Sequence, residues 1–243
     1  MNPSVQVYRK TSSPSQLVLF PFGGGSGYSY ISLIGKIERS VEIVMINPPG
    51  HLFNAGKPLE SIEEMVSIYL KELRPVLKEK PVLFGHSIGG LVAYEMCRKL
   101  ELERDVKKLI ISGINPPHST KEGVDLFSWM ETDELIRKCS EIGGMPQVFR
   151  QETELLETFI TGLRGDLKAL EAYDSGQAME YKKLETSGAI LHSKGDYIAN
   201  PEKIKEWQRF MDCTEIISFE GDHFYLFEES NTDKVCRVLY KYL

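Results

Sequence analysis

The chain is poor in positive charge and lacks long apolar runs. Its 29 Lys and Arg residues are outnumbered by 35 Asp and Glu residues, which gives a formal net charge of −6. Nucleic-acid-binding proteins gain affinity by releasing counterions from a basic face, so this balance argues against a nucleic-acid partner. No run approaches the roughly 18 apolar residues of a membrane-spanning helix, so we also expect no membrane partner.

Cysteine is scarce and shows no pattern that would hold a metal. The four cysteines, Cys97, Cys139, Cys213 and Cys236, are far apart and include no C-x-x-C pair. We therefore expect no metal site, and reduced thiols in a cytoplasmic protein. The N-terminal stretch MNPSVQVYRKTSSPSQ contains no long apolar segment, so we expect no secretory signal there.

Six short apolar runs predict β-strands. They are rich in Val, Ile, Leu and Phe and do not alternate cleanly with polar residues, which is typical of strands covered on both faces in a parallel sheet. The predicted strands are residues 16–22, 41–49, 81–87, 107–113, 188–196 and 214–221.

Helical patterns lie between several of these strands. Ser61 and Glu64 form a capping-box signature at the start of a helical pattern over residues 61–80, and we expect Pro75 to bend or loosen its last turns. Residues 88 to about 102 predict a second helix, and residues 233–243 a third. This alternation favours an α/β fold with a mainly parallel sheet, and one domain over residues 1–243.

One long segment, from about residue 118 to residue 183, breaks the alternation. It shows no convincing strand and predicts several short helices joined by Gly and Pro turns. Long insertions of this kind often form a lid or a binding element. Five of its side chains either line a pocket or simply pack among the helices: Phe127, Trp129, Met145, Phe149 and Phe159.

The motif GHSIG, residues 85–89, fits the pattern G-x-S-x-G between a predicted strand and a predicted helix. In that setting the pattern forms a sharp turn that exposes the serine hydroxyl, and the glycines are needed because the chain folds back tightly. The helix that follows directs its N–H groups and positive dipole end at the reacting centre. Ser87 is therefore the candidate nucleophile.

A serine nucleophile needs a base, and the base needs an orienting acid. In this architecture the expected chain order is Ser, then Asp or Glu, then His. His223 follows the last predicted strand and is the candidate base. Asp196 follows the fifth strand and is the candidate acid, with Glu202 as a distant alternative. We discount Asp222 because it adjoins His223 in the chain.

The glycine-rich segment FPFGGGSGY, residues 20–28, follows the first strand of this prediction. It is either a flexible loop or the loop that completes an oxyanion hole. One donor of such a hole is the backbone N–H of Ile88, and the other comes from Phe22 or Gly23. No phosphate-binding pattern such as G-K-[ST] fits this segment.

Several ordered motifs together resemble the type II thioesterases, hydrolases of the α/β-hydrolase superfamily that accompany nonribosomal peptide and polyketide synthases. LFGHSIGGLVAYEM resembles their Gly-His-Ser-Met-Gly-Gly elbow, with Ile88 at the methionine position. FEGDHFYL resembles their Gly-Gly-His-Phe-Phe-Leu motif, with Asp222 at the second glycine. The remaining matches are LFPFGGGSGYSY, INPPGH, ISGINPPH, IGGMP and LRGDLKALEAY.

The resemblance implies an α/β-hydrolase fold with a helical lid over residues 118–183. It also implies hydrolysis of acyl thioesters on the phosphopantetheine arm of carrier proteins, which clears misloaded or stalled groups. The phosphopantetheine belongs to the partner, so no cofactor of the chain's own is implied. Carrier proteins are typically acidic, and we expect local basic residues to offset repulsion by this acidic chain: Arg137, Lys138, Arg150, Arg164 and Lys168.

Two other functions fit the same residues. A carboxylesterase or lipase would carry an identical triad and elbow, because the fold does not fix the substrate. A non-catalytic binding module of the same fold would usually lack a member of the triad, whereas Ser87, Asp196 and His223 are all present.

Overall fold

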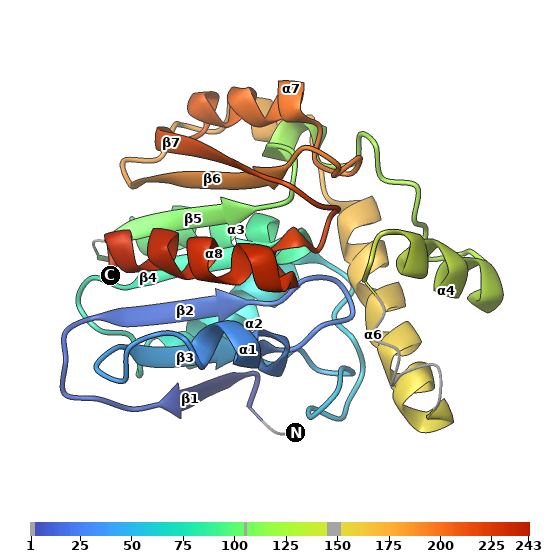
Figure 1. Ribbon diagram of the computed structural model, residues 1–243, viewed down its shortest axis with the longest axis horizontal. Helices are drawn as coiled ribbons and strands as arrows, with labels where there is room; N and C mark the ends of the chain where they lie inside the picture. Colours follow the sequence, from blue (N-terminus) through green and yellow to red (C-terminus); the bar gives the residue numbers. More distant parts are fainter. Residues whose placement is uncertain (1–2, 105, 145–151) are drawn as a thin grey trace.

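The computed structural model describes residues 3–104, 106–144 and 152–243, in which a seven-stranded sheet organises the chain (Figure 1). The strand order is β1-β3-β2-β4-β5-β6-β7, and only β1 runs antiparallel, against β3. The strands are β1 (Val5–Arg9), β2 (Gln16–Phe20), β3 (Glu42–Ile46), β4 (Val82–His86), β5 (Lys108–Ser112), β6 (Ser187–Ser193) and β7 (Asp212–Phe219).

All six predicted strands are confirmed, and β1 is an additional edge strand. Of its five residues, VQVYR, Val5 is buried, Tyr8 is exposed and the other three are half-buried, unlike the fully buried β2, β3 and β4. An edge strand needs no continuous apolar run, because only part of its surface faces the core.

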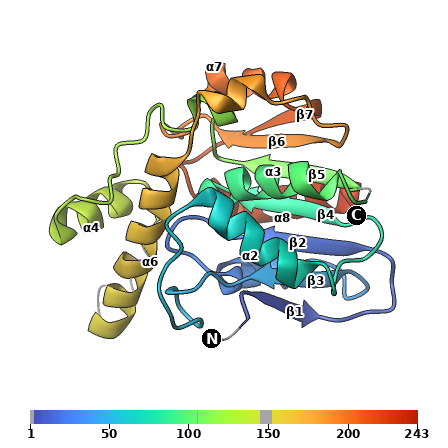
Figure 2. The same ribbon diagram turned by 180° about the vertical axis from the view of Figure 1, so that it is seen from behind.

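Helices cover both faces of the sheet (Figure 2). On one face lie α2 (Ile62–Leu73), α3 (Ile88–Leu100) and the short α7 (Pro201–Ile204). On the other lie α1 (Ile31–Ile34) and α8 (Glu229–Tyr242). Successive residues of β2 point to opposite faces of the sheet: Val18 packs on the α2 and α3 side, and Leu19 packs on the α8 side. This two-sided burial explains why the strand runs are continuously apolar.

Helix α2 begins as its sequence predicts but ends earlier. The Ser61 hydroxyl accepts a hydrogen bond from the Glu64 N–H at 3.4 Å, which caps the first turn. The regular helix ends at Leu73, two residues before Pro75, so the expectation of a helix to residue 80 was too long. Proline has no N–H and clashes with the preceding turn, so it ends this helix instead of bending it.

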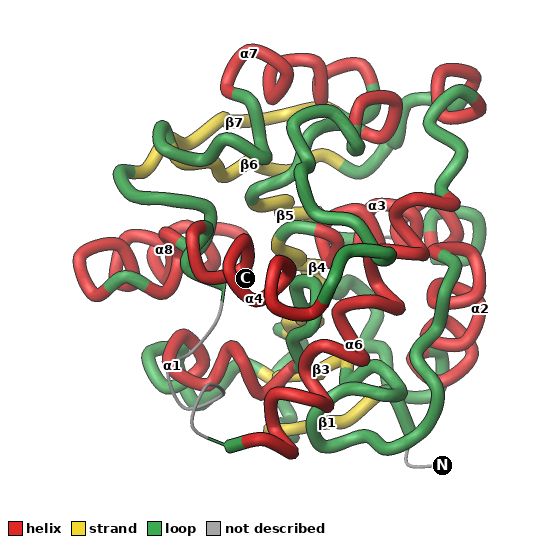
Figure 3. Tube along the Cα trace, turned by 90° about the vertical axis from the view of Figure 1, so that its right-hand side faces the viewer, coloured by secondary structure: helices red, strands yellow, loops and turns green. Residues whose placement is uncertain are grey.

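The chain between β5 and β6 supplies α4 (Thr132–Glu141) and α6 (Thr153–Ala172). Both helices lie beyond the carboxyl ends of the parallel strands (Figure 1), and Figure 3 shows them in front of that end of the sheet. Their apolar side chains form a third buried cluster with residues of the neighbouring loops. Within the described parts of the chain, no helix is long and apolar enough to cross a membrane.

Candidate active site

Ser87 occupies the sharp turn between β4 and α3. Its backbone φ of 54° and ψ of −132° are rare for a residue with a side chain. A Cβ at Gly85 would lie 2.1 Å from the carbonyl oxygen of Gly89, and a Cβ at Gly89 would lie 2.4 Å from that of Phe20. Only glycine fits at these two positions, and the turn raises the Ser87 side chain at the carboxyl end of the sheet.

His223 and Asp196 form a buried pair. His223 follows β7, Asp196 follows β6, and the His223 Nδ1 lies 2.8 Å from the Asp196 Oδ2. The other carboxylate oxygen accepts the N–H groups of Ile198 at 2.9 Å and Ala199 at 3.1 Å. With both oxygens engaged, the carboxylate is fixed, and it sets the His223 tautomer with its proton on Nδ1 and Nε2 free to accept one.

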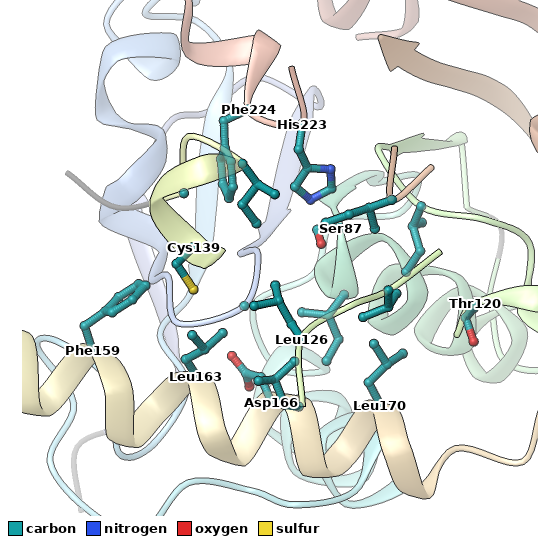
Figure 4. Close-up of a pocket in the computed structure, with 18 residues that line it drawn as sticks. Ser87, Thr120, Leu126, Cys139, Phe159, Leu163, Asp166, Leu170, His223 and Phe224 are labelled. Carbon is teal, nitrogen blue, oxygen red and sulfur yellow. The ribbon is translucent and has the colours of Figure 1, made fainter. Parts of the chain in front are cut away.

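A narrow cavity of about 60 Å³ lies at the turn that carries Ser87. Ser87 and His223 line it, and Figure 4 shows both side chains at its wall. Ile88 and Gly23 also line it, and Ile88 is the first residue of α3, so its N–H has no acceptor within the helix. The rest of the lining is mostly apolar, including Ile114, Val124, Leu126, Leu163 and Leu170.

A second cavity of about 670 Å³ adjoins the first. The two share Ile142, Gly144, Phe159 and Phe224 as lining residues. Phe22 lines this second cavity, where its ring meets that of Phe224 edge-on with centroids 4.8 Å apart. Of the two candidate donors in the glycine-rich loop, Gly23 therefore borders the Ser87 cavity and Phe22 borders its neighbour.

The ring of His86 packs against the ring of His223, and His86 is fully buried. Its Nδ1 lies 2.9 Å from the Ser112 hydroxyl, which in turn lies 2.6 Å from the Tyr225 hydroxyl. Burial, followed by the nearby His223, holds the pKa of His86 well below its ordinary value. His86 is therefore neutral near pH 7 and adds no positive charge beside His223.

A second His–Asp pair ties the insertion to the glycine-rich loop. The Nε2 of His51, in the loop after β3, lies 2.9 Å from the Oδ2 of Asp166 on α6. The same oxygen accepts the Gly24 N–H at 2.8 Å. This group was not predicted from the sequence. Its only signals were the INPPGH and LRGDLKALEAY motifs, which carried no assigned role.

The other expected site residues fall in different places. Glu202 is exposed on α7, whereas Asp222 lines the second cavity. Phe159 is buried and lines both cavities. Trp129 was wrongly grouped with the pocket candidates: it is 73% exposed and stacks on Phe127. Met145 and Phe149 lie outside the described residues.

The basic residues expected to face a carrier protein mostly have acidic partners. Arg137 pairs with Glu141 at 2.5 Å, and Lys168 pairs with Glu60 at 2.7 Å. Lys138 pairs with Asp125, and Arg164 donates to the Thr132 hydroxyl at 3.2 Å. Arg150 lies outside the described residues. These pairs leave little unbalanced positive charge on this part of the surface.

The side chains that could bind a metal do not gather anywhere in the described chain. Across residues 3–104, 106–144 and 152–243, no group of three or more His, Cys, Asp or Glu side chains is placed to hold a metal ion. The site described above is built from a hydroxyl, an imidazole, a carboxylate and backbone N–H groups. Such a set supports nucleophilic attack on a carbonyl carbon and stabilisation of the resulting oxyanion.

Comparison with known proteins relates most of the chain to one family. The family model described as a thioesterase domain matches residues 15–243. The probable anguibactin biosynthesis thioesterase AngT of Vibrio anguillarum is 32% identical over 223 residues, which are 87% of this chain and 86% of that relative. Thioesterase PikA5 of Streptomyces venezuelae is 29% identical over 220 residues, covering 88% of this chain and 76% of PikA5.

A solved structure supports the same relationship. YbtT, described as a type II thioesterase from the yersiniabactin NRPS/PKS biosynthetic pathway, superimposes with a TM-score of 0.82 at 25% identity. The match covers 99% of this chain and 100% of YbtT. The likeness therefore includes the sheet, the elbow region and the inserted helices together.

Proposed function

The chain belongs to the thioesterase family, and we propose that it hydrolyses acyl thioesters on the phosphopantetheine arm of carrier proteins in nonribosomal peptide or polyketide synthesis. The observation that carries the proposal is the Asp196–His223 pair, which has a 2.8 Å hydrogen bond between its members and whose histidine lines the same cavity as Ser87. The names of AngT and YbtT, which place these relatives in biosynthetic pathways, support the choice of substrate.

The first half of the proposed reaction forms an acyl-enzyme. The His223 Nε2 takes the proton of the Ser87 hydroxyl as the Ser87 oxygen attacks the thioester carbonyl carbon. Asp196 holds the imidazole in place and stabilises its cation through the Nδ1–H. The tetrahedral intermediate then collapses, the carbon–sulfur bond breaks, and the pantetheine thiol leaves with the proton from His223.

The second half releases the acid. A water molecule gives a proton to the His223 Nε2 and attacks the ester carbonyl carbon. The second tetrahedral intermediate breaks its bond to the Ser87 oxygen, which regains a proton from His223. Every proton is thus carried by one imidazole, and the proposed reaction needs no cofactor of the chain's own.

The oxyanion of both intermediates is held by backbone N–H groups. Ile88 supplies one from the start of α3, where the N–H is unpaired within the helix and the dipole favours negative charge. Gly23 supplies the other, because it lines the Ser87 cavity while Phe22 lines the adjoining one. The side chain of Ile88 is immaterial to this role, since any non-proline residue has the same N–H.

The two cavities suit the two parts of the substrate. The narrow, mostly apolar cavity at Ser87 takes the acyl group, and the larger cavity beside it leaves room for the arm. We further propose that α4 and α6 act as a lid within a single domain, because they lie over the carboxyl ends of the strands. All four cysteines are free, which fits a cytoplasmic setting.

Rates on matched substrates test the proposal. The same acyl group is offered as an acyl carrier protein, as a free thioester and as an oxyester, to the wild type and to Ser87→Ala. We expect the carrier thioester to be hydrolysed fastest, with Ser87→Ala inactive. Preference for the oxyester would instead identify a carboxylesterase. A fluorophosphonate probe should label the wild type but not Ser87→Ala, and a wild type that resists labelling would indicate a non-catalytic binding module.

A further inference from the structure

The loop that holds the proposed donor Gly23 contains three consecutive glycines, residues 23–25. Glycine lets the backbone approach a substrate closely, but it also leaves the free chain with the most conformations to choose from. Within the loop, the Gly25 N–H donates to the Phe22 carbonyl at 2.9 Å, which closes one turn. The orientation of the peptide between Gly23 and Gly24 depends on a contact from outside the loop.

That contact comes from α6. The Oδ2 of Asp166 accepts the Gly24 N–H at 2.8 Å, across 142 residues of sequence. A hydrogen bond to a carboxylate is stronger than one between neutral groups, and here it is buried. Because the Gly24 N–H belongs to the peptide that follows Gly23, this bond fixes the backbone immediately next to the proposed oxyanion donor.

The charge of Asp166 so close to an oxyanion site requires compensation, and His51 is placed to give it. Both ring nitrogens of His51 face oxygen acceptors: Nδ1 lies 3.0 Å from the Pro49 carbonyl, and Nε2 lies 2.9 Å from Asp166. Only the imidazolium can donate to both. Burial lowers the pKa of His51, but the charge and hydrogen bond of Asp166 outweigh it, with help from the Pro49 carbonyl, so the pKa is raised.

Helix α6 packs directly on these groups. A Cβ at Gly162 would lie 2.8 Å from the His51 ring, so the helix backbone approaches the imidazole as closely as a glycine permits. The Leu163 side chain lies 3.3 Å from where a Cβ of Gly23 would be. Figure 4 shows Asp166 and Leu163 on the same side of α6, toward the cavity. A shift of α6 away from the loop would therefore break the Gly24 bond and unpack Gly23.

We propose that Asp166 is a positioning residue: by holding the Gly23–Gly24 peptide it orients the adjoining Gly23 N–H toward the oxyanion, so that the oxyanion hole is complete only while α6 is docked. This inference rests on the proposed hydrolysis at Ser87. It joins two events, the docking of the inserted helix and the assembly of the second oxyanion donor, through one carboxylate oxygen.

Paired variants on α6 test the role. Asp166→Leu removes the acceptor, whereas Asp166→Asn loses the charge but keeps a carbonyl that can accept the Gly24 N–H. Glu171 is the matched control: its carboxylate also accepts a backbone N–H, that of Ser128 at 2.6 Å, but away from the loop. Glu171→Leu and Glu171→Gln therefore repeat the same chemical changes on the same helix.

The kinetic readout uses an acyl-N-acetylcysteamine thioester, which needs no carrier protein. Loss of one oxyanion donor lowers kcat by about 10²-fold, and we expect that loss in Asp166→Leu with KM nearly unchanged. The kcat of Asp166→Asn should fall less, because the carbonyl of its amide can still accept the Gly24 N–H. Both Glu171 variants should stay within about threefold of the wild-type kcat.

Hydrogen exchange of the peptide covering residues 20–28 gives a second readout that needs no turnover. This peptide should exchange faster in Asp166→Leu than in the wild type. Its exchange rate in Glu171→Leu should equal that of the wild type. If the wild type fails to hydrolyse any acyl thioester, the proposed function falls, while the exchange result still decides whether Asp166 orders the loop.

Three results would overturn the inference. The first is a kcat for Asp166→Leu as high as that of the Glu171 variants, and the second is unchanged exchange in the loop peptide. The third is an Asp166→Asn variant as slow as Asp166→Leu, because the effect would then come from the charge on His51 and not from the bond to Gly24. If Asp166→Leu does not fold, the same loop exchange is measured in Asp166→Ala, which also removes the acceptor, against Glu171→Ala, and equal exchange in these two variants rejects the role.

Discussion

The rings of His86 and His223 lie in contact, with centroids 4.8 Å apart and planes inclined by 38°. Burial and this neighbour hold the pKa of His86 well below its ordinary value. In the proposed mechanism His223 becomes an imidazolium in each half-reaction, and a second cation at His86 would oppose it. The chain thus keeps a titratable group beside its base but holds that group neutral.

The neutral His86 makes the fold sensitive to acid. The unfolded chain binds a proton at this histidine near about pH 6.5, whereas the folded chain does so only at lower pH, so stability falls as the pH drops below about 6.5. The contribution approaches about 1.4 kcal/mol for each pH unit. In urea unfolding, the free energy of unfolding should fall less on acidification for His86→Gln than for the wild type. Equal pH dependence of the two proteins would contradict this prediction.

A pair of variants tests Asp196 as the acid of the proposed triad against the alternative Glu202. Asp196→Asn keeps the shape but favours the wrong His223 tautomer, so kcat for a thioester should fall by on the order of 10⁴-fold. Glu202→Gln, at the exposed alternative on α7, should leave kcat unchanged. The reverse pattern in steady-state rates would move the acid to Glu202.

The meeting of these groups at one edge of the sheet was predictable for a physical reason. Parallel strands bring their carboxyl ends to one edge of the sheet, so residues that follow β4, β6 and β7 must meet there. Ser87, Asp196 and His223 each follow such a strand, and the structure places Asp196 within hydrogen-bond distance of His223. Their catalytic roles remain predictions.

The Asp166 group could not be predicted in the same way. Its contact with Gly24 depends on where α6 crosses the strand ends, and no local pattern in the insertion sets that position. His51 precedes Ser87 in the chain, so the expected order Ser, acid, His gives it no role, and its burial was not predicted. Strand β1 was not predicted for a different reason: it is an edge strand, and its apolar pattern is weak.

The His51–Asp166 pair should stabilise the fold most at lower pH, opposite to His86. Its folded pKa is raised, so the stabilisation is fully present below about pH 6.5 and is lost as the pH rises through the folded pKa. Two groups face the His51 ring, the Asp166 carboxylate on α6 and the Pro49 carbonyl. Tyr69 on α2 lies nearby, but burial raises its pKa so far that it stays neutral and does not contribute to this pH dependence.

Unfolding free energies of the wild type and His51→Gln measure this effect. The difference between them should be larger near about pH 6 than near about pH 9, because the imidazolium is the state that satisfies both acceptors. A difference that grows with pH would show instead that His51 is neutral in the folded chain.

The elbow predicts a sharp contrast between two glycines. A methyl group at Gly85 would sit 2.1 Å from the Gly89 carbonyl oxygen, so Gly85→Ala should destabilise the fold by more than about 3 kcal/mol. Gly35 has helical backbone angles, and the nearest atom to its added Cβ is at 3.4 Å. Gly35→Ala should be neutral or stabilising by up to about 1 kcal/mol in urea unfolding. Equal stability of the two variants would contradict the clash at the turn.

Phe159 controls the boundary between the two cavities. It lines both, and its ring lies 2.6 Å from where a Cβ of Gly24 would be, so it closes the space beside the glycine-rich loop. Phe159→Ala should join the cavities and admit longer acyl chains. Each added methylene that becomes buried contributes about 0.8 kcal/mol, so kcat/KM for octanoyl relative to acetyl thioesters should rise about tenfold or more.

The matched control for Phe159→Ala is Trp129→Ala, which removes another aromatic ring of the same insertion. Trp129 is 73% exposed, and its ring stacks on Phe127. Its loss should leave the ratio of octanoyl to acetyl rates unchanged. Of these two residues only Phe159 lines both cavities. A similar shift in both variants would therefore mean that acyl preference follows the general stability of the insertion.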